Sequence, residues 1–343
     1  MTNWPIKKLG EVLEKNGIIP AKIKRDEYQE SGKYPVVDQG ENLIAGYIDD
    51  ERRLYQGNLP VIVFGDHTRI IKYIDFPFAF GADGIKILRP QEILLPKFFY
   101  YTLILNPVAN QGYKRHFSLL AHTKMLIPPL AIQKQIVERL DKIAEAQKLN
   151  NGLIQKTDEL FQSLLHKELN PAGKDWEEDR FVNCIEKNPL KIKGIPREKY
   201  QSIGKFPIID QSDKFIVGYT DNEEKVYKID YPVIIFGDHT RIFKYIDFNF
   251  AIGADGTQII IPDTGKFIPK FFYFLMLNLK ISNLGYSRHF KLLKTKKLIL
   301  PPLQTQKQIV VKLSAVQDYK KQLLGQKSKL KELFDSALSK SMK

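Results

Sequence analysis

The chain has 343 residues, which is enough for about two domains of ordinary size that each bury a core. Its hydrophobic fraction of 43% and charged fraction of 27% exclude an intrinsically disordered protein. The formal net charge of +14 favours an acidic partner such as nucleic acid, and the single cysteine excludes an internal disulfide and a cysteine-rich zinc site.

Short runs of β-branched and aromatic residues dominate the first 110 residues or so. The runs at 60–64, 69–74 and 84–88 predict strands, because Gly and Asp separate them as turn signals. The run at 96–105 is longer, more apolar and begins with a proline, which predicts a buried helix. This mixture predicts an α+β domain over residues 1–130.

A Pro-Pro pair at residues 128–129 ends that domain, because proline removes a hydrogen-bond donor and keeps the preceding residue out of the helical region. One long helix then follows over residues 131–170. Its apolar positions recur every seven residues, the spacing of a helix that packs along a partner helix. The seam consists of Ile136, Ile143, Asn150, Thr157 and Leu164. We expect its two polar residues, Asn150 and Thr157, to set the register of the helix pair.

The second half of the chain repeats the first at an offset of about 172 residues. Residues 60–84 and 232–256 are identical at all but four positions, and the similarity covers nearly the whole chain. Such a period is too long for a solenoid repeat, so each copy is a domain and the two form a pseudo-two-fold pair. The predicted segments are a first domain, a central spacer helix, a second domain and a C-terminal spacer helix, over residues 1–130, 131–170, 171–303 and 304–343.

The C-terminal helix carries a second seven-residue seam. We expect the two helices to form a long antiparallel coiled-coil pair between the domains, with two unrelated surface helices as the alternative. The seam consists of Ile309, Val316, Leu323, Leu330 and Ala337.

Sequence motifs for catalysis are missing. No Gly-Lys pair is followed by Ser or Thr, so there is no P-loop, and the histidines lack metal-ligand spacing. The Pro-Pro-Leu strings lack the flanking residues of an amino-methyltransferase. We therefore predict no catalytic residue, no cofactor and no metal. The catalytic alternative is a stand-alone nuclease that uses Asp66, His67 and Asp83.

The chain also lacks an apolar run of the roughly 20 residues that cross a bilayer, and its N-terminus lacks the apolar stretch of a signal peptide. We expect a cytoplasmic protein with no membrane contact.

Two motifs carry a family resemblance, and each appears in both copies. An Arg-His-Phe string precedes Pro-Pro-Leu and a Gln-Lys-Gln-Ile-Val string at the start of each long helix, and each domain contains Phe-Gly-Asp-His-Thr-Arg. The full-length order of domain, helix, domain, helix resembles the specificity subunit of type I restriction–modification systems. The Arg-His-Phe strings begin at Arg115 and Arg288, and the Gln-Lys strings begin at Gln133 and Gln306.

The resemblance implies a non-catalytic subunit with two target-recognition domains that bind double-stranded DNA. Each domain would read half of a bipartite target, and the near-identity of the copies predicts a near-palindrome. Two methyltransferase subunits would dock on the helices, and a restriction subunit that translocates DNA would join through the complex. The chain is short for this family, which leaves an S-like subunit of a type II (IIB/IIG-like) enzyme as the alternative.

Candidate DNA contacts follow from the chemistry of the side chains. Arg69 and Arg241 suit guanine, whereas Gln39 and Gln211 suit adenine. Lysine and arginine elsewhere suit phosphates, which fix position without reading sequence. The alternative is that the Phe-Gly-Asp-His-Thr-Arg segment is a tight turn whose side chains cap backbone groups. The remaining candidates are His67, Thr68, Lys72, Lys114, Arg115, His239, Thr240, Lys244, Arg288 and Lys291.

Overall fold

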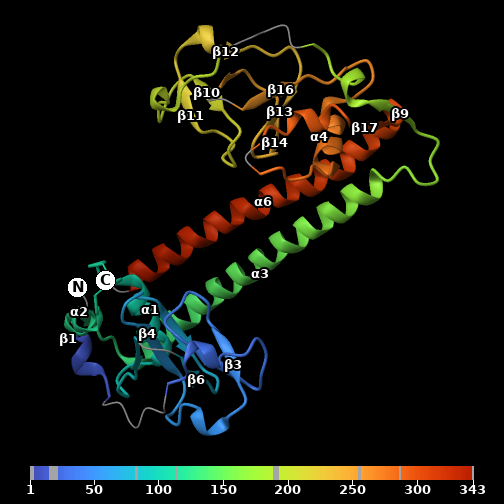
Figure 1. Ribbon diagram of the computed structural model, residues 1–343. Coiled ribbons are helices and arrows are strands. Elements are labelled where there is room, and N and C mark those ends of the chain that lie inside the picture. The colour runs from blue at the N-terminus through green and yellow to red at the C-terminus, as the bar shows by residue number, and fades with distance from the viewer. Residues whose placement is uncertain are drawn as a thin grey trace. The chain divides into compact units, whose positions relative to one another are not determined.

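A computed structural model describes residues 4–14, 22–81, 84–112, 114–187, 193–253, 256–285 and 287–341. The chain divides into two compact units. Unit 1 comprises Met1–Asn151 and Gly325–Lys343, and unit 2 comprises Gly152–Leu324. Each unit contains one domain and one part of each long helix (Figure 1).

The domain of unit 1 is built from small sheets. Strand β4 (Val61–Gly65) lies between β5 (Ile71–Ile74) and β7 (Ile85–Leu88), antiparallel to both. Strand β2 (Tyr34–Val37) pairs antiparallel with β3 (Gly46–Ile48) and parallel with β6 (Ala79–Phe80). Strands β1 (Ile6–Lys8) and β8 (Lys124–Leu126) form an antiparallel pair. The strands predicted at 60–64, 69–74 and 84–88 are thus confirmed as the β5–β4–β7 sheet.

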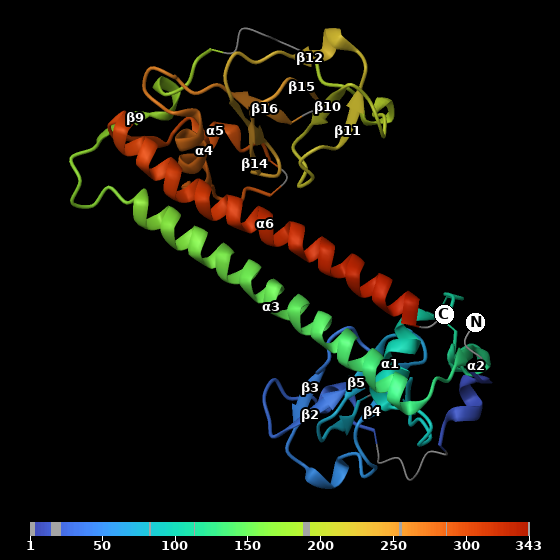
Figure 2. The same ribbon diagram turned by 180° about the vertical axis from the view of Figure 1, so that it is seen from behind.

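Strand β4 contributes to two of the hydrophobic cores of the domain. Its side chains alternate between the two faces of the sheet, as they do in any strand. Ile62 and Phe64 pack into the core that contains helix α1 (Pro96–Leu105) and the first turns of α3 (Leu130–Glu168), which Figure 2 shows beside this sheet. Val61 and Val63 pack into a second core with Phe78 and Phe80. The predicted helix at 96–105 is confirmed as α1, and a short helix α2 (Phe117–His122) follows it.

Unit 2 repeats this arrangement. Its central sheet has β13 (Val233–Gly237) between β14 (Phe243–Ile246) and β16 (Thr257–Ile260). A second sheet has the order β11 (Gly218–Thr220), β10 (Phe206–Ile209), β15 (Phe250–Ile252) and β12 (Val226–Tyr227). Strands β9 (Glu177–Arg180) and β17 (Lys297–Leu300) form the antiparallel pair. Helices α4 (Pro269–Asn278) and α5 (Phe290–Leu293) correspond to α1 and α2.

The long helices α3 and α6 (Leu303–Ser341) pack together, which confirms the predicted helical pair. Within unit 2, Lys320 forms an ion pair with Asp158, and Lys312 forms one with Glu168 at 3.0 Å. The partner on α6 changes from Lys320 to Lys312 as the residue on α3 changes from Asp158 to Glu168, so the helices run antiparallel there. Within unit 1, Gln147 Nε2 donates to the Leu330 carbonyl at 3.2 Å. The buried residues of the two seams are Ile136, Ile143, Asn150, Thr157, Ile309, Leu323 and Ala337, and the neighbouring Leu140 and Leu313 are also buried.

The two polar residues of the α3 seam are buried, and Asn150 and Thr157 are each 5% exposed. Thr157 Oγ1 donates to the Leu153 carbonyl of its own helix at 2.7 Å. A hydroxyl bonded within one helix does not distinguish one register from another, so the register role stays a prediction for Asn150. The domain boundaries at 130, 170 and 303 also stay our proposal. In the described part of the chain, no helix is both long and apolar enough to cross a bilayer.

Candidate nucleic-acid interface

The Phe-Gly-Asp-His-Thr-Arg segment contains the last two residues of β4 and the tight turn that follows it. The Arg69 amide donates to the Gly65 carbonyl at 2.7 Å and closes the turn. Thr68 Oγ1 donates to the Gln39 carbonyl at 2.6 Å, and the His67 amide donates to Gln39 Oε1 at 3.3 Å. The turn after β4 is therefore joined to the loop after β2, and we call residues 38–42 with residues 65–69 the loop pair of unit 1.

Unit 2 builds the same loop pair from residues 210–214 and 237–241. Thr240 Oγ1 donates to the Gln211 carbonyl at 2.5 Å, and the His239 amide donates to Gln211 Oε1 at 3.1 Å. In both units the threonine is exposed, whereas the histidine and the glutamine are half-buried. The structure thus brings the predicted Gln, His and Thr candidates together, and it shows that they also bind one another, as the turn alternative predicted.

Lys72 and Lys244 hold the loop pair from inside. Lys72 is 5% exposed, and its Nζ donates to the carbonyls of Asp38 and Asn42. Burial lowers the pKa of Lys72, although the Asp38 carboxylate lies 3.7 Å away. Lys244 donates in the same way to the carbonyls of Asp210 and Lys214. Because these ammonium groups are buried, we reassign both lysines from phosphate contacts to positioning residues.

Arg69 and Arg241 have an unusual backbone conformation. Both have a φ of 63°, in the left-handed region that costs an L-residue energy and that glycine adopts freely. Arg69 Nη1 donates to the Val108 carbonyl at 3.1 Å, and Arg241 Nη1 donates to the Ile281 carbonyl at 3.2 Å. Among the described residues, neither buried Nε atom has a hydrogen-bond partner. Strained residues of this kind are concentrated at functional sites, which supports both arginines as candidates.

A contact that the sequence did not reveal joins the turn to helix α2. The Asp66 carboxylate accepts a hydrogen bond from the Phe117 amide at 2.7 Å, at the start of that helix. The buried His116 ring accepts from the Gln111 amide through Nε2, so its Nδ1 donates to the Asp66 carbonyl at 3.0 Å. Asp238, His289 and Phe290 repeat the arrangement in unit 2. The sequence did carry one signal of this contact, because the separation of Asp66 and His116, 50 residues, is nearly that of Asp238 and His289, 51 residues.

This contact also bears on the nuclease alternative. Asp66 is 2% exposed and its carboxylate caps α2, which is a structural role. Asp83, the third member of the proposed trio, lies outside the described residues. No group of three or more His, Cys, Asp or Glu side chains in the described ranges could hold a metal ion.

In each unit, two predicted phosphate contacts lie on the segment that a buried histidine attaches to the turn. This histidine is His116 in unit 1 and His289 in unit 2. Lys114 and Arg115 immediately precede His116, whereas Arg288 and Lys291 lie on either side of His289. All four side chains are exposed, so these predicted phosphate contacts are open to solvent beside each loop pair.

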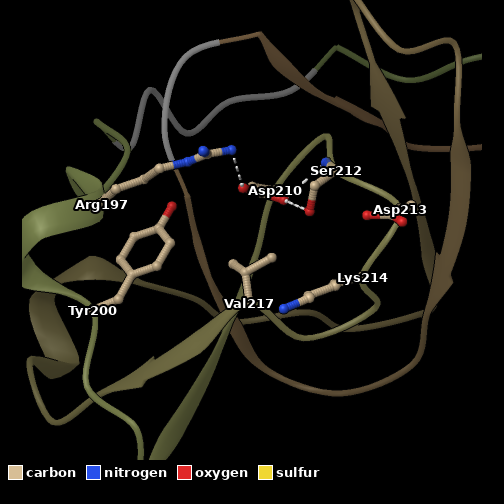
Figure 3. A pocket seen from close by; sticks show the side chains of 7 residues that line it. All are labelled: Arg197, Tyr200, Asp210, Ser212, Asp213, Lys214 and Val217. Atoms are coloured by element: carbon tan, nitrogen blue, oxygen red, sulfur yellow. Dashed lines mark hydrogen bonds and ion pairs between the residues drawn. The ribbon is translucent and has the colours of Figure 1, made fainter. Parts of the chain in front are cut away.

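A pocket of about 410 Å³ lies beside the loop 210–214 of unit 2 (Figure 3). At its centre, the Asp210 carboxylate is 1% exposed and accepts hydrogen bonds from the Ser212 amide at 2.9 Å and the Ser212 hydroxyl at 2.6 Å. Arg197 Nη2 lies 3.6 Å from the other carboxylate oxygen. A hydrogen-bonding concavity of this kind suits a polar group of a ligand. Its walls consist of Arg197, Tyr200, Asp210, Ser212, Asp213, Lys214 and Val217.

Gln133 explains the glutamine in the motif that opens each long helix. It is fully buried, and its Oε1 accepts a hydrogen bond from the Leu95 amide at 2.8 Å. Its Nε2 donates to the carbonyls of Ile93 and Pro128, each at 2.8 Å. Gln306 makes the equivalent bonds in unit 2. Each glutamine therefore fastens a domain to the first turn of its own helix.

Comparison with known proteins agrees with these features. A family model described as the type I restriction modification DNA specificity domain matches residues 1–158. The specificity subunit of the type I restriction enzyme EcoR124I/EcoR124II of Escherichia coli is 31% identical over 147 residues, which are 39% of this chain and 36% of that protein. A putative type I restriction enzyme MjaX specificity subunit of Methanocaldococcus jannaschii is 25% identical over 99% of this chain and 92% of its own length.

Solved structures share the fold. The S subunit of a type I restriction-modification system from M. genitalium has a TM-score of 0.68 and 17% identity, and the match covers 99% of this chain and 96% of that one. A chain from a structure of type I R-M complex assembly and conformational transition has a TM-score of 0.58 and 15% identity, over 99% and 97% of the two chains.

Proposed function

We propose that this chain is a specificity subunit of a type I restriction–modification system and that it reads a two-part DNA target, one half with each domain. Subunits of this family recognise DNA and leave catalysis to other subunits. The observation that carries the proposal is the loop pair, which both units build from the same side chains with the same hydrogen bonds. Exposed cations flank it in each unit and suit the phosphates of a duplex.

The two half-sites should be similar and inverted. Residues 65–69 and 237–241 are identical and Asp38-Gln39 recurs as Asp210-Gln211, and similar chemistry reads similar bases. Each domain is fastened to the start of its own helix, and the two helices run antiparallel. We therefore infer an interrupted near-palindrome, with a spacer between its halves.

Modification subunits should dock on the long helices. These helices keep large apolar side chains exposed along their length, and such side chains favour a protein partner. The restriction subunit would join through the resulting complex. The exposed side chains are Leu149, Leu153, Leu160, Val311, Tyr319, Leu324 and Leu333.

The type II alternative was based on the short chain. The match to the M. genitalium S subunit covers nearly all of both chains, so the length does not set this protein apart from type I subunits. We therefore retain the type I assignment.

Sequencing of methylated bases in a host that carries the system tests the proposal. We expect methylation within an interrupted near-palindrome, and its loss when this gene alone is deleted. If methylation persists in the deletion strain, the chain is not the recognition subunit. If the two half-sites are unrelated, the inverted-symmetry part of the proposal is wrong while DNA recognition stands.

A further inference from the structure

The two loop pairs share one scaffold but present different side chains at one point. Lys72 fixes the carbonyl of Asn42 in unit 1, and Lys244 fixes the carbonyl of Lys214 in unit 2. The same threonine and glutamine contacts hold both loops against the turn. Residues 42 and 214 therefore start from equivalent backbone positions, and both side chains are exposed.

The neighbouring positions differ less in chemistry. Glu41 and Asp213 both carry a carboxylate, so the acceptor beside the variable position is retained. Gly40 corresponds to Ser212, whose hydroxyl bonds to the buried Asp210 and is therefore occupied within the loop. The change from Asn42 to Lys214 thus makes the main chemical difference between the exposed parts of the two loops.

Three further positions at which the units differ, 86, 114 and 118, are less suited to base reading. The Lys86 ammonium lies 5.7 Å from the centre of the Phe117 ring, so this side chain is engaged with helix α2 rather than with the loop pair. Lys114 corresponds to Ser287, and Ser118 corresponds to Lys291, so an exposed cation lies on a different side of the histidine in each unit. A single ammonium group at such a position suits a phosphate.

We infer that residues 42 and 214 make the two half-sites differ, with adenine read by Asn42 and guanine read by Lys214. This inference rests on the proposed function. An asparagine amide donates and accepts, which matches N6 and N7 of adenine in the major groove. An ammonium group only donates, which matches O6 and N7 of guanine. In unit 2 the adjacent Asp213 carboxylate could accept from the N4 amino group of the paired cytosine, so the two residues together suit a G·C pair.

The test selects a randomised double-stranded DNA library with the full chain at low salt and sequences what binds. The wild type should select a split consensus with adenine in one half and guanine at the mirrored position of the other. K214N should change that guanine to adenine and make the consensus more symmetric. N42K should make the opposite change in the other half. We expect each exchange to alter the preference for the affected base roughly 5- to 150-fold.

K291S is the matched control, because it removes an exposed lysine from the same domain. It should weaken binding to all sequences about equally and leave the consensus unchanged. A loop exchange, S212G/D213E/K214N, provides a second variant that imports the whole unit 1 loop and should give the same symmetric consensus as K214N. Thermal unfolding of every variant checks that the domains stay folded.

The outcomes separate the two proposals. If the wild type selects a split consensus but K214N, N42K and the loop exchange leave its bases unchanged, this inference is overturned and the proposed function stands. A change at some other base position also overturns it. If the wild type selects no split consensus, the proposed function fails first, because there are then no half-sites to distinguish.

Discussion

Replacement of Lys72 by methionine should lower the free energy of unfolding by about 3 kcal/mol and abolish reading of one half-site. The ammonium group is 5% exposed and satisfies two backbone carbonyls of the loop. Its loss leaves these carbonyls and the Asp38 carboxylate, itself 6% exposed, without their cation. Denaturant unfolding gives the stability change, and selection from a randomised duplex library shows which half of the consensus disappears.

The replacement of Lys124 by methionine is the control, because this lysine of the same domain is exposed on β8. Its effect should stay within about 0.5 kcal/mol. K244M should reproduce the result of K72M for the other half-site. If K72M retains both stability and the full consensus, the lysine does not hold the loop pair.

The pH dependence of stability provides an independent check on Lys72. Burial lowers its pKa in the folded protein, so the unfolded chain binds more protons between that lowered value and the ordinary value of 10.5. The lysine therefore contributes a rise in stability as pH increases through this window, and other titrating groups contribute equally to wild type and K72M. The free energy of unfolding of the wild type minus that of K72M should therefore increase as pH rises through this window.

Replacement of Gln133 by alanine should lower the free energy of unfolding by about 3–5 kcal/mol. The side chain is fully buried and satisfies the Leu95 amide and the carbonyls of Ile93 and Pro128. Each buried group left without a partner costs about 1–3 kcal/mol, although water that enters the cavity offsets part of this cost. Denaturant unfolding followed by tryptophan fluorescence measures the change.

Gln135 offers a matched control two residues farther along the same helix. Its side chain is exposed, so Q135A should change stability by no more than about 0.5 kcal/mol. Q306A and Q308A form the equivalent pair in unit 2, where Gln306 is buried and Gln308 is exposed. Equal effects of Q133A and Q135A would show that the buried contacts do not fasten the domain to its helix.

Local patterns in the sequence were sufficient for the architecture. The seven-residue seam, the strand runs around residue 62 and the proline-led helix at 96–105 are each repeated in the second half of the chain. A pattern of this kind reports which face of an element is buried, because its period equals the period of the helix or strand. The duplication and the family motifs, which also lie in the sequence, together indicate a DNA-recognition subunit.

Tertiary structure alone decided the roles of individual polar residues. Lys72 and Lys114 are both lysines beside a motif, yet one is buried within the loop pair and the other is exposed. Gln133 and Gln135 differ in the same way within one helix. The partners of the buried lysine and glutamine lie about 30 to 40 residues away in the chain, except for one nearby carbonyl. A polar side chain is buried only where backbone groups such as these form hydrogen bonds with it. No local periodicity of the sequence predicts these long-range hydrogen bonds.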